Sequence, residues 1–333
     1  MFLKNSEPIT VALDGTGGDR GSEGIVGAVR FAFAMYPALK LIIYGPSSLQ
    51  EALIKSRADA ERYDFVLAPQ AIPQDEEPRR VLKYHSRSAM AQALQAVKDG
   101  RAHAMISGGG TGPLVALSRH ILGITGHVRP ALCARMPVGP GRFAMMLDLG
   151  ANATATASDL YGFARLGAAA SEYVIEISSP RLALLNIGTE QGKGPEVIRK
   201  ARDLIGSDPR LNFMGFIEPN RIFSGDADII VTDGFTGNIA LKAAEGVAGI
   251  YTSVSGVKRF FSRFSHPDWL IPWQYNGSLL LGVKGIVIKS HGAAGNEAMA
   301  IAMVEAARAA SCNLGVMLSS SPLIKPAGAA KLS

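Results

Sequence analysis

Short apolar runs alternate with longer segments of helical periodicity along most of the chain. Most of the runs are continuous rather than alternating, which is typical of strands that are covered on both faces of a sheet. The runs that predict strands are residues 9–14, 41–44, 64–67, 102–107, 143–149, 182–187, 227–232 and 286–289. The segments that predict helices are residues 23–36, 88–98, 114–123, 158–170, 195–205 and 296–311.

Local signals support two of these helices. Pro195 suits a first helical turn, and Ser158 with Asp159 offers a cap before an apolar-periodic segment. Strands that alternate with helices in this way predict an α/β fold, with a mainly parallel sheet and helices on both sides. No Pro/Ser-rich linker and no internal repeat marks a domain boundary.

Composition narrows the class of protein. The 333 residues are 47% hydrophobic and 19% charged, which excludes intrinsic disorder for the chain as a whole. Two cysteines, Cys133 and Cys312, are too few for a disulfide scaffold or a thiolate zinc site; we interpret Cys133 as a core residue. We find no secretory signal and no apolar run long enough to span a membrane, so we expect an intracellular protein.

The net charge of +6 is a mild basic bias. It fits anionic substrates or a membrane surface and is weak evidence for nucleic acid.

The chain has 37 glycines, and four clusters of them follow predicted strands, at residues 15–18, 108–112, 188–194 and 234–237. The carboxyl ends of parallel strands line the ligand crevice of an open α/β sheet, and backbone N–H groups there bind anions. A tight turn explains any one cluster. Four clusters that also carry Asp, Asn, Thr or Lys favour an anion site.

Several familiar motifs are absent from the sequence. Gly194 rather than Ser or Thr follows Lys193, which argues against a Walker A loop, and residues 15–18 are only a weak match to a dinucleotide fingerprint. We find no Gly-x-Ser-x-Gly elbow and no histidine spacing typical of a metal site.

Further motifs follow one another in a fixed order over residues 10–310. They are VALD at 11–14 with GGD at 17–19, RPAL at 129–132, LDLGAN at 147–152, LLNIG at 184–188 with KG at 193–194, DGFTGN at 233–238 with LK at 241–242 and EG at 245–246, and KSHGAA at 289–294. In order and spacing they resemble the bacterial phosphate acyltransferases of phospholipid synthesis, which convert acyl-[acyl-carrier protein] and inorganic phosphate into acyl phosphate.

The resemblance implies a three-layer α/β/α fold related to phosphate acetyltransferases and isocitrate-type dehydrogenases. We expect one large domain over residues 1–318 with a helical amphipathic protrusion near 247–276. We also expect a loose tail at 319–333, because the residues there are small and polar and include two prolines. The resemblance also implies a homodimer that uses no metal or organic cofactor and takes its acyl group from acyl-carrier protein. We expect this cytoplasmic protein to attach to the inner face of the cell membrane and to bind no nucleic acid.

The chain departs from the family pattern at Thr16, where Met is usual, and at Pro113, where Ala is usual. Gly110 stands where the family favours Asn, which removes one amide from the expected site.

The implied reaction sets the roles of the candidate residues. Phosphate is already an anionic nucleophile, so the protein must position it and stabilise the developing oxyanion. The candidate catalytic residues are Lys193, Asn238, Lys242, Asp233 and His291. The candidate substrate- and phosphate-binding residues are Asp14, Gly17, Gly18, Gly109, Gly110, Thr111, Gly112, Asn152 and Asn186.

Some of these roles remain open. Lys242 lies four residues after Asn238, so both can face one side of a helix, although a surface lysine is an equal alternative. Asp233 is placed either to orient Lys193 or Lys242, or to cap the helix that starts near Asn238. His291 can protonate the departing thiolate, bind phosphate, or be structural.

A basic and aromatic segment follows residue 254. Basic residues beside aromatic ones suit an amphipathic element in a headgroup layer, and a dimer helix with buried aromatics is the alternative. The residues expected to face the membrane are Lys258, Phe260, Phe261, Phe264 and Trp269.

Three other functions stay open. A nicotinamide-dependent decarboxylating dehydrogenase would need an aspartate-rich metal site and a nucleotide loop, and we see neither in the sequence. A coenzyme A-linked transferase of small acyl groups is the second alternative, because the sequence distinguishes neither the acyl chain length nor the acyl carrier. A membrane-binding scaffold without catalysis is favoured only by the Gly110 departure.

Overall fold

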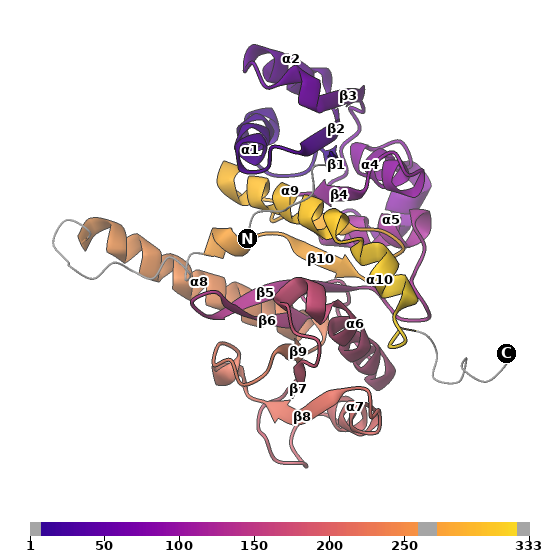
Figure 1. Cartoon of the computed structure of the whole chain (residues 1–333), viewed down its shortest axis with the longest axis vertical. Coiled ribbons are helices and arrows are strands. Elements are labelled where there is room, and N and C mark those ends of the chain that lie inside the picture. The colour runs from indigo at the N-terminus through magenta and orange to yellow at the C-terminus, as the bar shows by residue number, and fades with distance from the viewer. Residues whose placement is uncertain (1–7, 259–271, 325–333) are drawn as a thin grey trace. The chain divides into compact units, whose positions relative to one another are not determined.

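The computed structural model describes residues 8–258 and 272–324 and divides into two compact units. Unit 1 contains the described residues of Met1–Pro130 and Asn276–Ser320, and unit 2 contains those of Ala131–Tyr275 and Ser321–Ser333 (Figure 1). The expectation of one large domain over residues 1–318 stays a prediction.

Unit 1 is built on strands in the order β3-β2-β1-β4-β11-β10. The pairs are parallel except for the antiparallel pair of β10 and β11. The strand bounds are β1 (Ile9–Asp14), β2 (Leu39–Gly45), β3 (Tyr63–Leu67), β4 (Ala104–Ser107), β10 (Ser278–Leu281) and β11 (Val287–Lys289). In β1 the consecutive residues Val11, Ala12 and Leu13 are all fully buried, so helices cover both faces as the continuous apolar runs predict.

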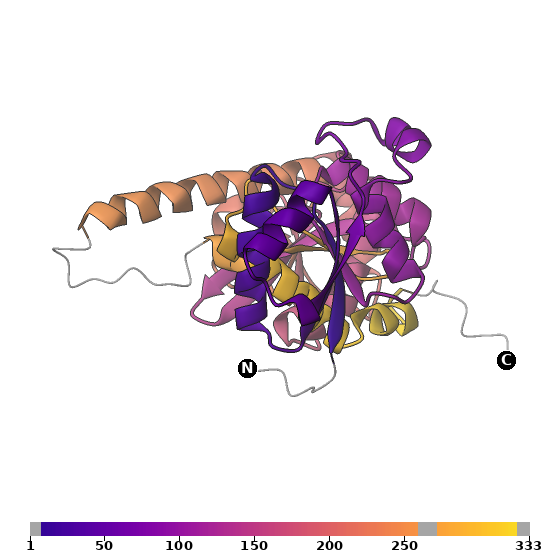
Figure 2. The ribbon, with the colours of Figure 1, turned by 90° about the horizontal axis from the view of Figure 1, so that it is seen from above.

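The helices of unit 1 pack in two groups. Helix α1 (Gly21–Met35) packs on α9 (Asn296–Ser311), and α4 (Ala89–Lys98) packs on α5 (Thr111–Ile121); α9 and α4 both contact β1 (Figure 2). The remaining helices are α2 (Ser47–Lys55), η1 (Ala60–Arg62), α3 (Pro78–Tyr84) and α10 (Leu314–Ser320).

Unit 2 has strands in the order β5-β6-β9-β7-β8, and only the pair of β5 and β6 is antiparallel. The strand bounds are β5 (Ala131–Gly139), β6 (Arg142–Leu147), β7 (Arg181–Leu185), β8 (Asn212–Ile217) and β9 (Ile229–Val231). The helix bounds are α6 (Ala157–Ile175), α7 (Glu196–Gly206), η2 (Pro219–Arg221), α8 (Gly234–Lys258) and η4 (Pro272–Tyr275). Helix α6 packs on β6 and β9, and α8 extends well beyond the strands of its own unit (Figure 1).

The predicted fold class, an α/β fold with a mainly parallel sheet, is confirmed. Every predicted strand and helix is present, with ends that differ by a few residues. Strands β5, β8 and β10 and helices α2, α3 and α10 were not predicted. The cap of α6 is Thr156 rather than Ser158: its hydroxyl accepts the N–H of Asp159, whose carboxylate accepts the N–H of Thr156.

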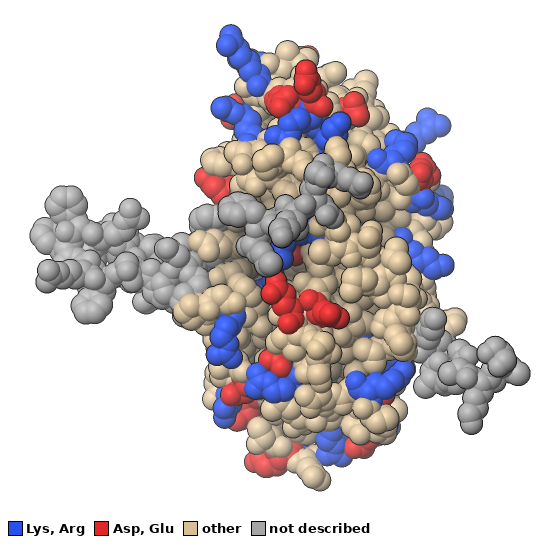
Figure 3. Space-filling model, viewed as in Figure 1, with Lys and Arg blue, Asp and Glu red and all other residues tan. Residues whose placement is uncertain are grey.

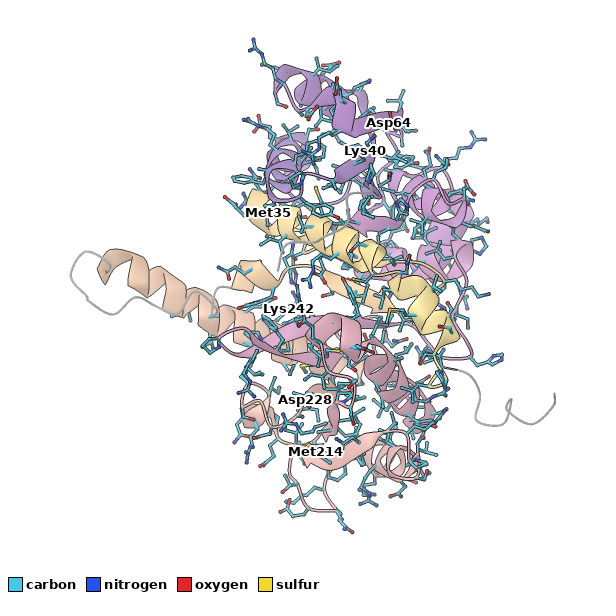
Figure 4. The ribbon with its side chains drawn as sticks, viewed as in Figure 1. Met35, Lys40, Asp64, Met214, Asp228 and Lys242 are labelled. Carbon is cyan, nitrogen blue, oxygen red and sulfur yellow. The ribbon has the colours of Figure 1, made fainter. Side chains whose placement is uncertain are left out.

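Two arginine–aspartate pairs fasten loops in unit 2. Asp228, labelled in Figure 4, accepts hydrogen bonds from the Arg181 guanidinium at 2.7 and 3.0 Å, and Arg181 also donates to the Gly225 carbonyl. Asp208 accepts from Nε and Nη2 of Arg210 at 2.8 and 2.6 Å and from the Tyr161 hydroxyl at 2.8 Å. These bidentate pairs combine charge with fixed geometry.

The start of the C-terminal tail is held in unit 2. The guanidinium of Arg210 donates to the Pro322 carbonyl, Arg165 donates to the Leu323 carbonyl, and Ile324 is buried. The tail that the sequence predicts to be loose is therefore anchored up to Ile324, and its remaining residues lie outside the described part of the chain.

Charge and hydropathy add two further facts. On the face drawn in Figure 3, basic and acidic side chains are interspersed, so the excess positive charge forms no single basic stripe there. No single helix among the described residues is long and apolar enough to span a membrane; α9 and α10 meet the criteria only as a pair with a 53° bend between them.

The Asp208–Arg210 pair predicts a pH dependence of stability. The Arg210 guanidinium holds the pKa of the Asp208 carboxyl well below its usual range, so the pair stabilises the fold fully above the unfolded pKa of about 3.9 and less as the pH falls toward the folded pKa. Asp208→Asn should lower the free energy of unfolding by about 1–2 kcal/mol at pH 7. Urea unfolding at pH 7, 5 and 3 should show the same deficit at pH 7 and 5 and a smaller one at pH 3. A deficit that stays constant to pH 3 would contradict this origin.

Candidate functional site

In unit 1, Asp14 ends β1 and organises the turn that follows. Its Oδ1 accepts the N–H and the hydroxyl of Thr16, and its Oδ2 accepts the Ser107 hydroxyl at 2.6 Å from the end of β4. Asp14 is buried, and burial raises the pKa of its carboxyl while these donors counteract the rise. Asp14 therefore stabilises the turn, and its carboxylate oxygens are already hydrogen-bonded and are not exposed to a substrate.

The glycine turn of unit 1, Gly108–Gly110, lies between β4 and α5 and packs against the Asp14 turn. A Cβ on Gly17 would lie 2.6 Å from the Gly109 nitrogen, so only glycine lets the two turns approach this closely. The Ser107 hydroxyl accepts the Gly109 N–H. The N–H groups of Gly110, Thr111 and Gly112 donate to no described residue, and Gly112 is exposed. The turn therefore presents open donors of the kind that bind an anion.

Gln74 was missed by the sequence reasoning, and it explains the departure at Gly110. A Cβ on Gly110 would lie 2.2 Å from the backbone carbonyl oxygen of Gln74, so no larger residue fits unless that segment moves. The Gln74 amide donates to the Gly108 carbonyl at 3.4 Å. Gly110 is thus required by a packing partner that is distant in sequence.

The turn after β11 is held by a second residue that the sequence reasoning missed. The buried Asn276 donates to the Ser290 hydroxyl and the Ala298 carbonyl, and its Oδ1 accepts the N–H of His291 at 3.2 Å. His291 itself is exposed at the end of this strand.

In unit 2, the buried Asp148 stabilises a turn after a strand, as Asp14 does in unit 1. Its Oδ1 accepts the N–H groups of Leu132 and Ala151, and its Oδ2 accepts the backbone and side-chain N–H groups of Asn152. Asp148 is fully buried, which raises the pKa of its carboxyl, and the four donors act in the opposite direction. The candidate Asn152 therefore uses its amide to hold this turn.

Helix α8 begins directly on the Asp148 turn. A Cβ on Gly237 would lie 2.1 Å from the Asp148 carbonyl oxygen, and a Cβ on Gly234 would lie 2.3 Å from the Asn152 carbonyl oxygen. Asp233 caps the helix, because its carboxylate accepts both the N–H and the hydroxyl of Thr236. Of the two roles left open for Asp233, the geometry favours the cap, and the helix starts at Gly234 rather than near Asn238.

The loop after β7 carries Lys193 at an exposed position. Asn186, which is buried, donates to the carbonyls of Gly188 and Lys193 and so closes this loop instead of offering its amide to a ligand. Within the described residues, Lys193 forms no ion pair, so its ammonium group is available to an anion.

Asn238 and Lys242 lie one turn apart on α8. The Asn238 side chain lies 3.7 Å from the position that a Cβ on Gly150 would take, so it borders the Asp148 turn. Lys242, labelled in Figure 4, is exposed and has no ion pair with a described residue. Unit 2 thus brings Asn238 and Lys242 to one end of α8, beside the Asp148 turn.

Three further features of the sequence analysis concern Cys133, metal ligands and the membrane-facing residues. Cys133 is buried as expected, and its burial raises the pKa of the thiol to about 12. The described residues contain no group of three or more His, Cys, Asp or Glu side chains that could hold a metal ion. Lys258 ends α8, and Phe260, Phe261, Phe264 and Trp269 lie outside the described residues, so their membrane role stays a prediction.

The contact of α8 with the Asp148 turn predicts a contrast between two glycines of one helix. Gly237→Ala should lower the free energy of unfolding by about 1–3 kcal/mol, because the new methyl group overpacks against the Asp148 carbonyl. Gly246→Ala, where no atom lies within 4 Å of the new Cβ, should stabilise the protein by up to about 1 kcal/mol through helix propensity. Urea unfolding of both variants tests this, and two changes of the same sign would refute it.

Comparisons with known proteins identify the family of this chain. The model of the family described as "Fatty acid synthesis protein" matches residues 9–317. A phosphate acyltransferase of Aeromonas salmonicida is 41% identical over 325 residues, covering 93% of this chain and 95% of the relative. A phosphate acyltransferase of Moritella marina is 40% identical over 316 residues, covering 90% of this chain and 94% of the relative.

Among solved structures, a phosphotransacetylase from Streptococcus pyogenes aligns with a TM-score of 0.63 at 18% identity, over 91% of this chain and 94% of that one. A branched-chain phosphotransacylase from Enterococcus faecalis aligns with a TM-score of 0.58 at 17% identity, over 91% and 99%. At this sequence identity, the two solved structures establish only the fold. The family model, in contrast, matches residues of both units. The chain therefore belongs to the fatty acid synthesis protein family, together with relatives named phosphate acyltransferase.

Proposed function

We propose that the protein transfers a fatty acyl group from acyl-[acyl-carrier protein] to inorganic phosphate, and that the acyl phosphate formed serves phospholipid synthesis. The observation that carries the proposal is an identity of about 40% to relatives named phosphate acyltransferase over nine tenths of the chain. Each unit carries groups of the kind that such a transfer uses: N–H donors in unit 1 and lysines in unit 2 that have no ion pair with a described residue.

In the proposed reaction, a phosphate oxygen attacks the thioester carbonyl carbon. A carbon–oxygen bond forms, the carbon–sulfur bond breaks, and the thiolate leaves and takes up a proton. A thiol has a pKa of about 8.5, so its thiolate leaves without a strong acid. Positioning of phosphate and stabilisation of the carbonyl oxyanion therefore account for the catalysis.

The described residues divide these tasks. The N–H groups of Gly110, Thr111 and Gly112 are suited to hold phosphate or the oxyanion. Lys193 and Lys242 add positive charge, and the amide of Asn238 adds a neutral donor. His291, exposed after β11, is a candidate proton source for the thiolate. No step in this scheme requires a cofactor.

We also propose that the enzyme is a homodimer that attaches to the cytoplasmic face of the membrane. Support comes from α8, where Phe235, Ile239, Val247 and Ile250 are each more than half exposed. Their spacing places them along one side of the helix, and such an apolar stripe suits a partner or a lipid surface.

The activity is tested by incubating the full chain with palmitoyl-acyl-carrier protein and phosphate and trapping acyl phosphate as a hydroxamate. The double variant Lys193→Ala with Asn238→Ala should lose at least about 10²-fold in rate, because both substitutions remove transition-state donors. Lys200→Ala, a lysine in an exposed ion pair with Glu196, is the matched control and should keep full activity. No turnover by the unaltered protein would refute the function. Turnover with palmitoyl-coenzyme A alone would change the donor, and full activity of the double variant would refute the site.

Membrane attachment is tested by sedimentation with anionic phospholipid vesicles. Phe260→Asp with Trp269→Asp should abolish co-sedimentation, because two charged groups would replace apolar rings in the headgroup layer. The circular dichroism spectrum should not change. Undiminished binding of the variant would exclude this segment as the attachment site.

A further inference from the structure

The segment before α3 covers the glycine turn of unit 1 through Gln74. The backbone carbonyl oxygen of Gln74 occupies the space beside Gly110, 2.2 Å from where a Cβ would be, and the side chain continues to Gly108. Gln74 thus touches both ends of the glycine turn, Gly108 through its amide and Gly110 through its backbone.

The same amide reaches the turn after β11. Nε2 of Gln74 lies 3.1 Å from the position that a Cβ on Gly292 would take, and the two carboxylate oxygens of Asp19 lie 3.1 and 3.2 Å from that position. The N–H of Asp19 donates to the Gly292 carbonyl at 2.8 Å. The Gln74 side chain therefore donates to the turn after β4 and lies beside the turn after β11.

The chemistry of an amide suits this place. A glutamine amide has two N–H donors, and one of them is directed at the Gly108 carbonyl. A lysine at position 74 would instead be drawn to the Asp19 carboxylate, and a glutamate would face the Gly108 carbonyl with an oxygen. The neutral amide of Gln74 donates to the Gly108 carbonyl without adding a charge beside the proposed anion site.

The position of Gln74 is also open to solvent. Gln74 is exposed, whereas Gly108, Gly109 and Gly110 are buried. The buried turn contributes rigid peptide groups, and the exposed amide holds the carbonyl end of this turn, so that the N–H groups at its other end keep their direction.

We propose that Gln74 is a positioning residue for phosphate: it holds the glycine turn of unit 1 in the shape that directs the N–H groups of Gly110, Thr111 and Gly112 at the anion. The inference rests on the proposed function in taking inorganic phosphate as the substrate. It assigns Gln74 to the phosphate and not to the acyl donor.

The test compares two glutamines of one segment. Gln74→Met keeps the length of the side chain and removes the amide. Gln70→Met is the matched control, because the Gln70 amide donates to the Tyr84 carbonyl at 3.1 Å, at the end of α3. Binding of inorganic phosphate to the full chain is measured by 31P NMR titration, and KM for phosphate and for the acyl donor are measured in the transfer assay.

Gln74→Met should raise the Kd and KM for phosphate about tenfold, the effect of one hydrogen bond in an anion site, and should leave KM for the acyl donor unchanged. Gln70→Met should leave phosphate binding unchanged. Gln74→Glu should weaken phosphate binding more than Gln74→Met, because it turns a donor into a negative charge.

Three results would overturn the inference: wild-type phosphate affinity in Gln74→Met, equal losses in the Gln74 and Gln70 variants, or equal rises in KM for both substrates. An unaltered protein that binds no phosphate would overturn it as well. A protein that binds phosphate in a Gln74-dependent manner but forms no acyl phosphate would support the inference while refuting the proposed function.

Discussion

Burying a carboxylate is costly unless donors surround both of its oxygens, and each unit of this protein meets that condition at the end of a parallel strand. Asp14 accepts from Thr16 and Ser107, and Asp148 accepts four N–H groups from Leu132, Ala151 and Asn152. Because these donors belong to the turns themselves, the carboxylates determine the path of the backbone there. The turns that we propose to bind an anion are thus built around buried carboxyl groups whose oxygens already accept hydrogen bonds.

The glycines follow from this arrangement. Gly17 packs on the Gly109 nitrogen, and Gly234 and Gly237 let the first turn of α8 rest on the Asp148 turn. In each case the neighbour is a backbone atom, which cannot move aside as a flexible side chain can. At these strand ends, glycine is therefore a requirement of close backbone contact.

The proposed chemistry uses what these turns leave over. The oxygens of Asp14 and Asp148 and the amides of Asn152 and Asn186 are engaged in holding loops, whereas the N–H groups at the start of α5 and the ammonium groups of Lys193 and Lys242 have no described partner. The residues that shape these turns and the residues that we propose to meet the substrate are therefore different sets. Gly110 and Gln74 are a further example of residues that shape a turn. Gly110 has no side chain, and the backbone carbonyl of Gln74 packs in the space that a side chain there would fill.

Most of the fold was predictable because its strands are continuous apolar runs and its helices are periodic. Strand β5 escaped prediction because Arg135 and Pro137 interrupt its apolar pattern. Strand β10 escaped prediction because it is an apolar run of only four residues, too short to stand out before its pairing with β11 is known. The sequence alone determined which strand ends carry glycines, aspartates and lysines. Only the tertiary structure decided which of these side chains are used to hold turns, and that Asn276 and Gln74 hold two of these turns as well. The physical reason is that hydrogen bonds and close contacts join residues far apart in the chain, and no local pattern encodes the partner.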